Sequence, residues 1–105
     1  MAYEARYVFK PNAGADLDQI MGAMKQCAAL WNKHGAPRPR LWSTTAGELG
    51  NYVLVAQFDN AAGYAKVVDS LSADPDFRRW QADNVKAGAI QWVRSNLLRE
   101  VDLAP

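Results

Sequence analysis

The segment that most constrains this chain is one that is apolar on both of its faces. Residues 51–59 read Asn-Tyr-Val-Leu-Val-Ala-Gln-Phe-Asp. Alternate side chains of a strand point to opposite faces of a sheet. One face then carries four apolar side chains and the other carries two: Tyr52, Leu54, Ala56 and Phe58 against Val53 and Val55. A strand of this kind is normally covered on both faces, so the sequence predicts an interior strand with material packed on each side.

Six further segments carry helix or strand patterns. Strands are predicted at 3–10, 40–46 and 92–103, and helices at 16–33, 61–71 and 75–87. The first helix has apolar residues at i, i+3, i+4 and i+7, the period of an amphipathic helix. Asp16, Asn60 and Asp74 are residue types that cap helix N-termini. Pro37 and Pro39 cannot donate to a strand ladder, so they favour a sheet-edge position for strand 40–46.

The order of the elements predicts the fold class. It is β-α-β-β-α-α-β, and two right-handed β-α-β units place the strands in the order 4-1-3-2 of a ferredoxin-like, four-stranded antiparallel sheet. The 105 residues suit a single α+β domain spanning 1–105. Helices can cover only one face of such a sheet, which leaves an apolar face open. We therefore expect the chain to pair with itself as a homodimer through its sheet faces.

Composition excludes several kinds of partner. The formal net charge is +1, whereas a nucleic-acid-binding protein needs a clustered basic excess. No apolar run approaches the roughly 18 residues of a membrane span, and the N-terminus has no signal-peptide pattern. Cys27 is the only cysteine, which rules out a disulfide framework or a cysteine-based metal site. We expect a cytoplasmic protein with no nucleic-acid or membrane partner.

Several segments together resemble a known family. They are the helix end at 33–35, the strand start at 51–54, the strand-to-helix turn at 58–65, the helix junction at 71–77 and the closing segment 97–101. In these the chain resembles the dimeric α+β barrel superfamily, and most nearly its NIPSNAP-like members. The resemblance implies a barrel made by two subunits, with ligands bound between the sheet and the helices of each. It also implies a range of activities: cofactor-free monooxygenases, isomerases, haem-binding and haem-degrading enzymes, and members without known activity.

His34 is the only histidine and the one side chain whose ordinary pKa lies near neutrality. It is the candidate catalytic residue, as a general base or haem ligand at the mouth of a pocket. The alternative is that it is a cation at a helix C-terminus that interacts with the helix dipole.

Four aromatic residues and one arginine are the candidate ligand-binding residues. Tyr7, Trp31, Trp42 and Trp80 would line an aromatic pocket for a planar molecule, or else belong to the core. Arg40 would bind a carboxylate, or else be an edge-strand charge that deters aggregation.

Motifs of other activities are missing from the sequence. It has no glycine-rich phosphate loop, no pair of histidines for zinc and no nucleophile elbow. No cofactor or metal is expected, and the Asn, His and Trp set of the family's haem-degrading branch cannot be placed as a whole.

Two hypotheses about the function remain. One is a small-molecule-binding homodimer that acts on an aromatic or polyketide-like compound as a cofactor-independent monooxygenase or isomerase. The other is a non-catalytic dimeric interaction or stress-associated module of the NIPSNAP-like type.

Overall fold

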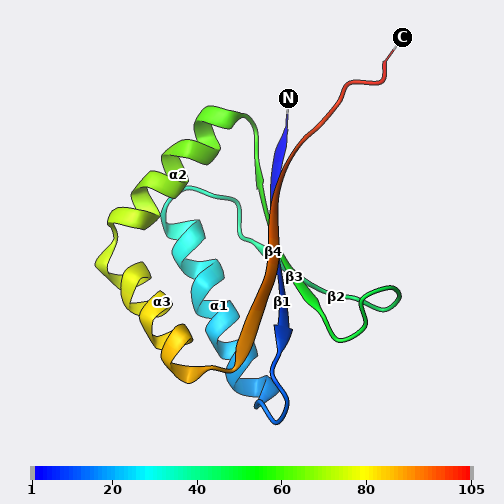
Figure 1. The fold of residues 1–105 in the computed structure, drawn as a ribbon. Coiled ribbons are helices and arrows are strands. Elements are labelled where there is room, and N and C mark those ends of the chain that lie inside the picture. The colour runs from blue at the N-terminus through cyan, green and yellow to red at the C-terminus, as the bar shows by residue number, and fades with distance from the viewer. Residues whose placement is uncertain (1, 105) are drawn as a thin grey trace.

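The computed structural model describes residues 2–104 and has seven elements in the predicted order (Figure 1). They are β1 (Tyr3–Pro11), α1 (Leu17–Lys33), β2 (Arg40–Ser43), β3 (Tyr52–Phe58), α2 (Ala61–Ala73), α3 (Pro75–Ala87) and β4 (Ile90–Arg99). The predicted β-α-β-β-α-α-β order is therefore confirmed.

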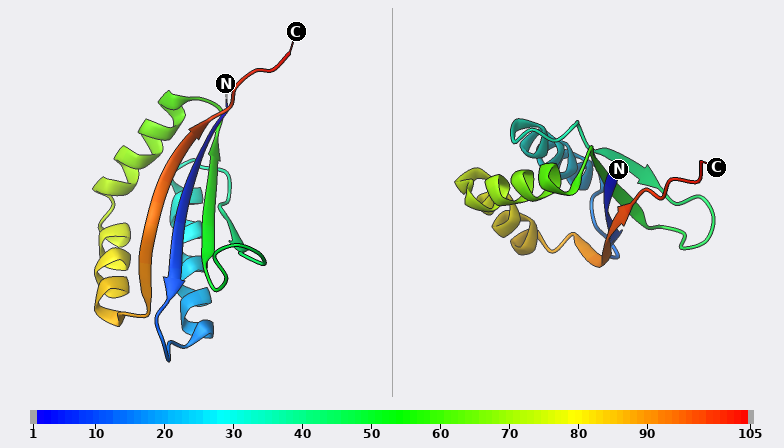
Figure 2. Two further views of the ribbon diagram at one scale, coloured as in Figure 1. Left: turned by 45° about the vertical axis from the view of Figure 1, so that its right-hand side comes forward. Right: turned by 90° about the horizontal axis from the view of Figure 1, so that it is seen from above.

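The four strands form one antiparallel sheet in the order β2-β3-β1-β4, as predicted. The doubly apolar strand β3 is interior, and the proline-preceded strand β2 lies at an edge. All three helices lie on the same side of the sheet, so its other face is free of helices (Figures 1 and 2). This face is called the open face below.

Local sequence signals explain where the helices begin and end. The side chains of Asp16, Asn60 and Asp74 each accept a hydrogen bond from a backbone N–H of the following first turn, at 2.9 Å for Asp16 and 2.8 Å for Asn60 and Asp74. Such caps satisfy amide groups that have no partner inside the helix. Gly35 and Gly88 follow α1 and α3 with φ of 98° and 61°, a region that favours glycine.

The core fills the space between the helices and the sheet. From the sheet it takes Ala5 and Phe9 of β1 together with alternate residues of β3, and Phe9 has no exposed surface. Helix α1 contributes the stripe that its periodicity predicted: Ile20, Met24, Cys27, Ala28 and Trp31. Full burial of a side chain such as Phe9 is worth about 1.5–3 kcal/mol.

Two strands end three or more residues before their predicted ends, and β4 begins two residues before its predicted start. Strand β2 ends at Ser43 rather than residue 46, because a turn with Gly47 and Gly50 at positive φ begins there and the Thr44 N–H bonds to the carbonyl of Asn51 at 3.0 Å. Strand β4 ends at Arg99 rather than residue 103. Its last residue pairs with Tyr3, the first residue of β1, and only one further bond follows, from the Glu100 N–H to the carbonyl of Ala2 at 2.8 Å.

The open face combines apolar and charged side chains. Val53 and Val55 are half-buried on it, and Trp42 of β2 is 55% exposed beside them. The connection after β2 reaches across the face, where Glu48 accepts a hydrogen bond from Arg94 of β4 at 2.9 Å. The face thus carries the predicted valines, but also polar pairs that the pattern of β3 alone does not reveal.

None of the helices within residues 2–104 combines the length and apolar character that crossing a membrane would require.

Candidate ligand pocket

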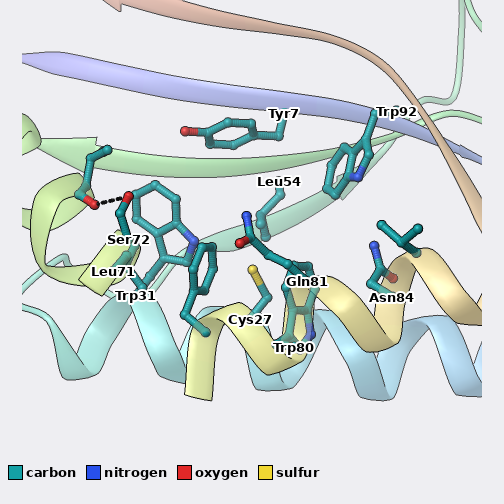
Figure 3. Close-up of a pocket in the computed structure, with 13 residues that line it drawn as sticks. Tyr7, Cys27, Trp31, Leu54, Leu71, Ser72, Trp80, Gln81, Asn84 and Trp92 are labelled. Carbon is teal, nitrogen blue, oxygen red and sulfur yellow. Dashed lines mark hydrogen bonds between the residues drawn. The ribbon is translucent and has the colours of Figure 1, made fainter. Parts of the chain in front are cut away.

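A cavity of about 360 Å³ lies between the sheet and the helices. Tyr7 and Leu54 line it from the sheet, and Trp92 lines it from the start of β4. All three helices complete the wall (Figure 3). Its volume falls at the small end of the roughly 300–1,000 Å³ that ligand pockets occupy.

Aromatic rings form much of this wall. Tyr7 and Trp31 lie with ring centroids 5.8 Å apart, and Phe77 stacks on Trp80 at 5.9 Å with an angle of 16° between the rings. The indole N–H of Trp80 donates to the carbonyl of Ala23 at 2.9 Å, which ties α3 to α1 and fixes the ring. Such flat, rigid surfaces suit the face of a planar molecule.

Trp92 stands at the side of the cavity where β4 is not covered by a helix. Its side chain is 45% exposed, although it points to the helix side of the sheet and meets Phe9 edge-on with centroids 5.6 Å apart. An exposed tryptophan beside a cavity leaves apolar surface for a ligand to cover.

The ionisable side chains of the wall are uncharged at neutral pH. Burial raises the pKa of the Cys27 thiol to about 12. Burial, reinforced by nearby Tyr64, likewise raises the pKa of Tyr7 above its ordinary value. A thiol in this state is a poor nucleophile, so Cys27 acts as apolar wall rather than as a reactive group.

Three further polar side chains reach the cavity. The Ser72 hydroxyl donates to the carbonyl of Val68 at 2.9 Å and is therefore occupied. Gln81 and Asn84 are one helical turn apart on α3, and Figure 3 shows the Gln81 amide between Cys27 and Leu54. Gln81 is exposed and Asn84 is half-buried, and among residues 2–104 neither side-chain amide has a hydrogen-bond partner, so both can bond to a ligand.

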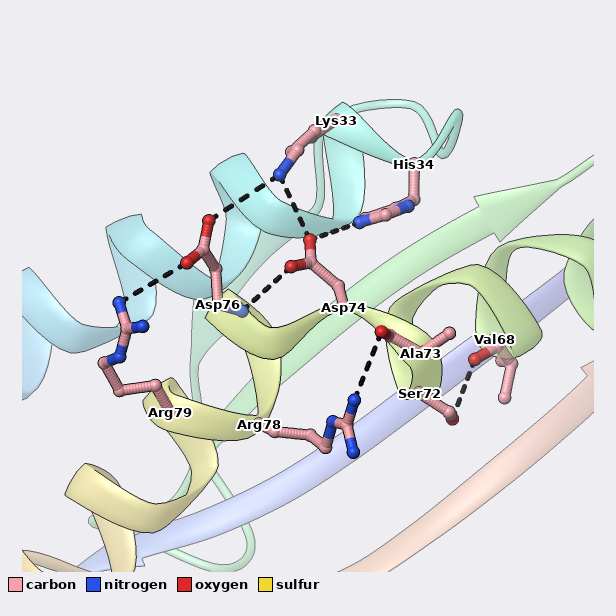
Figure 4. Close-up of polar contacts among 9 residues, drawn as sticks. All are labelled: Lys33, His34, Val68, Ser72, Ala73, Asp74, Asp76, Arg78 and Arg79. Carbon is pink, nitrogen blue, oxygen red and sulfur yellow. Dashed lines mark hydrogen bonds and ion pairs between the residues drawn. The ribbon is translucent and has the colours of Figure 1, made fainter.

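His34 lies elsewhere, at the C-terminal end of α1. Its Nε2 donates to a carboxylate oxygen of Asp74 at 2.6 Å, and Lys33 donates to the same oxygen at 3.2 Å (Figure 4). The His34 side chain is 18% exposed and that of Asp74 is 7% exposed. The cluster ties the end of α1 to the junction of α2 and α3.

Across the part of the chain that the structure describes, no group of three or more His, Cys, Asp or Glu side chains is arranged to hold a metal ion.

The family follows from a sequence comparison. The model of the NIPSNAP family matches residues 3–105, which is nearly the whole chain. This protein belongs to the NIPSNAP family. No curated protein matches its sequence.

Solved structures with the same fold include other NIPSNAP proteins. A NIPSNAP domain protein from Burkholderia xenovorans is 21% identical with a TM-score of 0.71, and the match covers 100% of this chain and 99% of that one. A NIPSNAP family protein from Agrobacterium tumefaciens is 17% identical with a TM-score of 0.71, covering 100% and 92%. SnoaB, a cofactor-independent oxygenase from Streptomyces nogalater, is 14% identical with a TM-score of 0.71, covering 99% and 97%. Identities this low show the shared fold, which is that of the dimeric α+β barrels.

The cavity between the sheet and the helices of this NIPSNAP protein brings together three of the candidate residues identified from the sequence. Tyr7, Trp31 and Trp80 line it. Trp42 and Arg40 lie on the open face, because they pair in register with Val53 and Val55 of β3 and share their side of the sheet. His34 is not among the residues that line the cavity, so its catalytic role stays a prediction that the geometry of the pocket does not use.

Sequence reasoning missed Gln81, Asn84 and Trp92. A signal for the first two exists: they continue the Phe77–Trp80 stripe of α3 at helical spacing, and amides in an apolar stripe mark a wet or functional position. No sequence pattern identifies Trp92 as a pocket residue. The side of the sheet to which its side chain points depends on a register shift between β1 and β4 after Val8.

Proposed function

We propose that this NIPSNAP protein binds a small aromatic or polyketide-like molecule in the helix–sheet pocket and acts on it as a cofactor-independent monooxygenase or isomerase. The observation that carries the proposal is the cavity of about 360 Å³ with Tyr7, Trp31, Phe77, Trp80 and Trp92 in its wall. The likeness in fold to SnoaB, which is a cofactor-independent oxygenase, supports the oxygenase chemistry.

The reaction needs only the substrate and dioxygen. A ring methylene flanked by conjugated groups loses a proton, and the resulting carbanion supplies the electrons that reduce dioxygen. One oxygen atom ends in a new carbonyl group and the other leaves as water with the two methylene hydrogens, so that R₂CH₂ + O₂ gives R₂CO + H₂O. The protein would hold the flat substrate between Trp31 and Trp80, while Gln81 and Asn84 orient its carbonyl group.

An anthrone probe tests the proposal. Anthrone has three fused rings and an acidic methylene, and the reaction converts it to anthraquinone. We expect saturable quenching of tryptophan fluorescence by anthrone, with oxygen uptake and anthraquinone formation faster than in a protein-free blank. Ser72→Trp fills the cavity from the exposed side of α2 and should weaken binding about tenfold or more.

Asp69→Trp is the matched control, because it adds the same ring to an exposed position of α2 that does not line the cavity. It should bind anthrone as the unchanged protein does. If anthrone quenches without saturation, or if both variants behave alike, the pocket is not the site and the proposal is refuted.

The second candidate is a binding module without catalysis. It is favoured by one observation: within residues 2–104 the cavity wall holds no side chain that is a base at neutral pH, since Tyr7 and Cys27 are protonated and His34 bonds to Asp74 elsewhere. Proton abstraction would then depend on the acidity of the substrate itself. Saturable binding of anthrone without oxygen uptake above the blank would select this candidate.

Both candidates include a homodimer, which we propose forms through the open face. The support is the set of apolar groups that the helices leave uncovered: Trp42 is 55% exposed and Leu98 40%, beside the half-buried Val53 and Val55. A second copy offers the same apolar surface with the same charged pairs around it, as a two-fold interface requires. Sedimentation velocity at low micromolar concentration tests it, and a well-folded monomer would contradict it.

A further inference from the structure

The wall of the helix–sheet pocket carries no charge. Its described lining contains no Asp, Glu, Lys, Arg or His side chain. None of the charged residues of α3 lines it: Asp83 and Lys86 are exposed, and the guanidinium of Arg78 donates to the carbonyl of Ala73. The wall is open to water at Ser72, Gln81 and Val85, so a charged ligand placed there would lose part of its hydration without gaining an opposite charge, which is unfavourable.

The same wall offers two neutral hydrogen-bonding groups at one side. Gln81 and Asn84 are separated by three residues on α3, a spacing that places side chains on one face of a helix. A primary amide has both donor and acceptor atoms, so each can bond to a carbonyl, a hydroxyl or another amide. Figure 3 shows these two amides on the α3 side of the cavity, across from Tyr7 of the sheet.

The rest of the wall restricts the shape of a ligand rather than its charge. The stacked pair Phe77 and Trp80 is held in place by the hydrogen bond from Trp80 to the carbonyl of Ala23. Trp31 is also fixed, in contact with Tyr7 and with Phe58 at a centroid distance of 6.1 Å. Fixed rings around a small cavity favour a flat aromatic ligand.

We infer that the pocket selects uncharged, flat aromatic molecules over charged ones of the same shape, and that the side-chain amides of Gln81 and Asn84 hold the ligand's carbonyl or hydroxyl group. This inference rests on the proposed function, because both place the ligand in the same pocket. It concerns which molecules bind, and does not require that any of them is oxidised.

Naphthalene derivatives of matched shape test the selection. At pH 7.5, 2-naphthamide is neutral, 2-naphthoate is an anion and 2-naphthylmethylammonium is a cation. Binding is followed by tryptophan fluorescence and by calorimetry. We expect 2-naphthamide to bind about tenfold or more tightly than either ion. Equal affinities for the amide and the carboxylate would overturn the inference.

Variants of α3 test the role of the amides. Gln81→Leu and Asn84→Leu should weaken 2-naphthamide binding severalfold and leave the binding of naphthalene, which has no polar group, unchanged. Gln81→Glu should shift the preference toward 2-naphthylmethylammonium. Gln91→Glu is the matched control, because Gln91 is exposed opposite Lys10 and lines none of the cavities.

The outcomes separate this inference from the proposed function. If 2-naphthamide is preferred but anthrone is not oxidised, the selection holds and only the oxygenase chemistry fails. If anthrone is oxidised but naphthamide and naphthoate bind equally, the oxygenase stands and the selection fails. If the Gln81 and Asn84 variants bind naphthamide as tightly as the unchanged protein, these residues do not recognise the ligand.

Discussion

The carboxylate of Asp74 joins the end of α1 to the first turn of α3. It accepts hydrogen bonds from His34 of the α1 C-terminus, from Lys33 and from the backbone N–H of Asp76 in the first turn of α3. These bonds hold the pKa of Asp74 well below its usual range. The bond from His34 is the largest cause, and the other two bonds lower the pKa further. One side chain thus acts as helix cap and as link between α1 and the α2–α3 junction.

The lowered pKa of Asp74 predicts a pH-dependent stability. A carboxyl whose pKa is lower in the folded state than in the unfolded state stabilises the fold above its unfolded pKa of about 4, and this stabilisation is lost as the pH falls toward the folded pKa. Asp74→Asn keeps a capping side chain but removes the charge. We expect this variant to be less stable than the unchanged protein at pH 7, with the difference shrinking below about pH 4.

Urea unfolding at pH 7 and pH 3 measures this difference. Asp76→Asn is the control, because Asp76 lies in the same turn and is exposed, with Lys33 at 3.8 Å. It should change the free energy of unfolding little at either pH. A difference between Asp74→Asn and the unchanged protein that stays constant with pH would show that the charge of Asp74 is not what stabilises the junction.

The place of a single candidate residue could be predicted only where the sequence shows which way its side chain points. Tyr7 and Trp31 lie in strongly periodic elements, so their inward direction follows from the sequence. Trp42 and Arg40 lie in a strand of four residues, where facing depends on the pairing with β3. His34 is the C-cap residue of α1, and the direction of a side chain at a helix end depends on tertiary contacts such as the one with Asp74.

At the level of elements, helix α2 depends on the N-cap residue that precedes it. Asn60 caps it by accepting a hydrogen bond from the backbone N–H of Gly63 at 2.8 Å, and both residues are near the surface. We expect Asn60→Ala to lower the free energy of unfolding by about 1 kcal/mol. Asn60→Ser, which retains a capping oxygen, should lower it by much less. Urea unfolding at neutral pH measures both, and an equal loss in the two variants would mean that capping is not the cause.

Element boundaries were predicted best for helices. Caps and apolar stripes are local, so α3 has the predicted bounds and α1 and α2 differ by one or two residues at one end. Strand ends depend on the neighbouring strand instead. Strand β4 stops where β1 begins, and no pattern within residues 92–103 shows that limit.

At the scale of the whole molecule, the strand order was predictable because topology rules leave few arrangements. Two right-handed connections fix β2-β3-β1-β4 once seven elements are recognised. The composition of the open face was less predictable, because its polar pairs come from different strands. Glu4 of β1 accepts a hydrogen bond from Gln57 of β3 at 3.0 Å, and Glu48 accepts one from Arg94 of β4 at 2.9 Å; such pairs between segments appear only in the folded sheet.

The open face yields a prediction for assembly. Trp42→Lys places a charge on the most exposed apolar residue of the proposed interface and should weaken self-association about tenfold or more. Leu17→Lys is the control, because Leu17 is similarly exposed, at 49%, but begins α1 on the other side of the sheet. Sedimentation velocity at low micromolar concentration compares them. If both variants associate as the unchanged protein does, the open face is not the contact.

The pairing of β1 with β4 has a practical consequence for labelling. The N–H of Glu100 bonds to the carbonyl of Ala2 at 2.8 Å, so the two chain ends leave the molecule together. Figure 1 shows them at the opposite end of the sheet from the loop that joins α3 to β4. A fluorophore or surface tether attached to either terminus therefore stands clear of Trp92 and the amides of α3, and ligand titrations can be carried out on immobilised protein without obstruction.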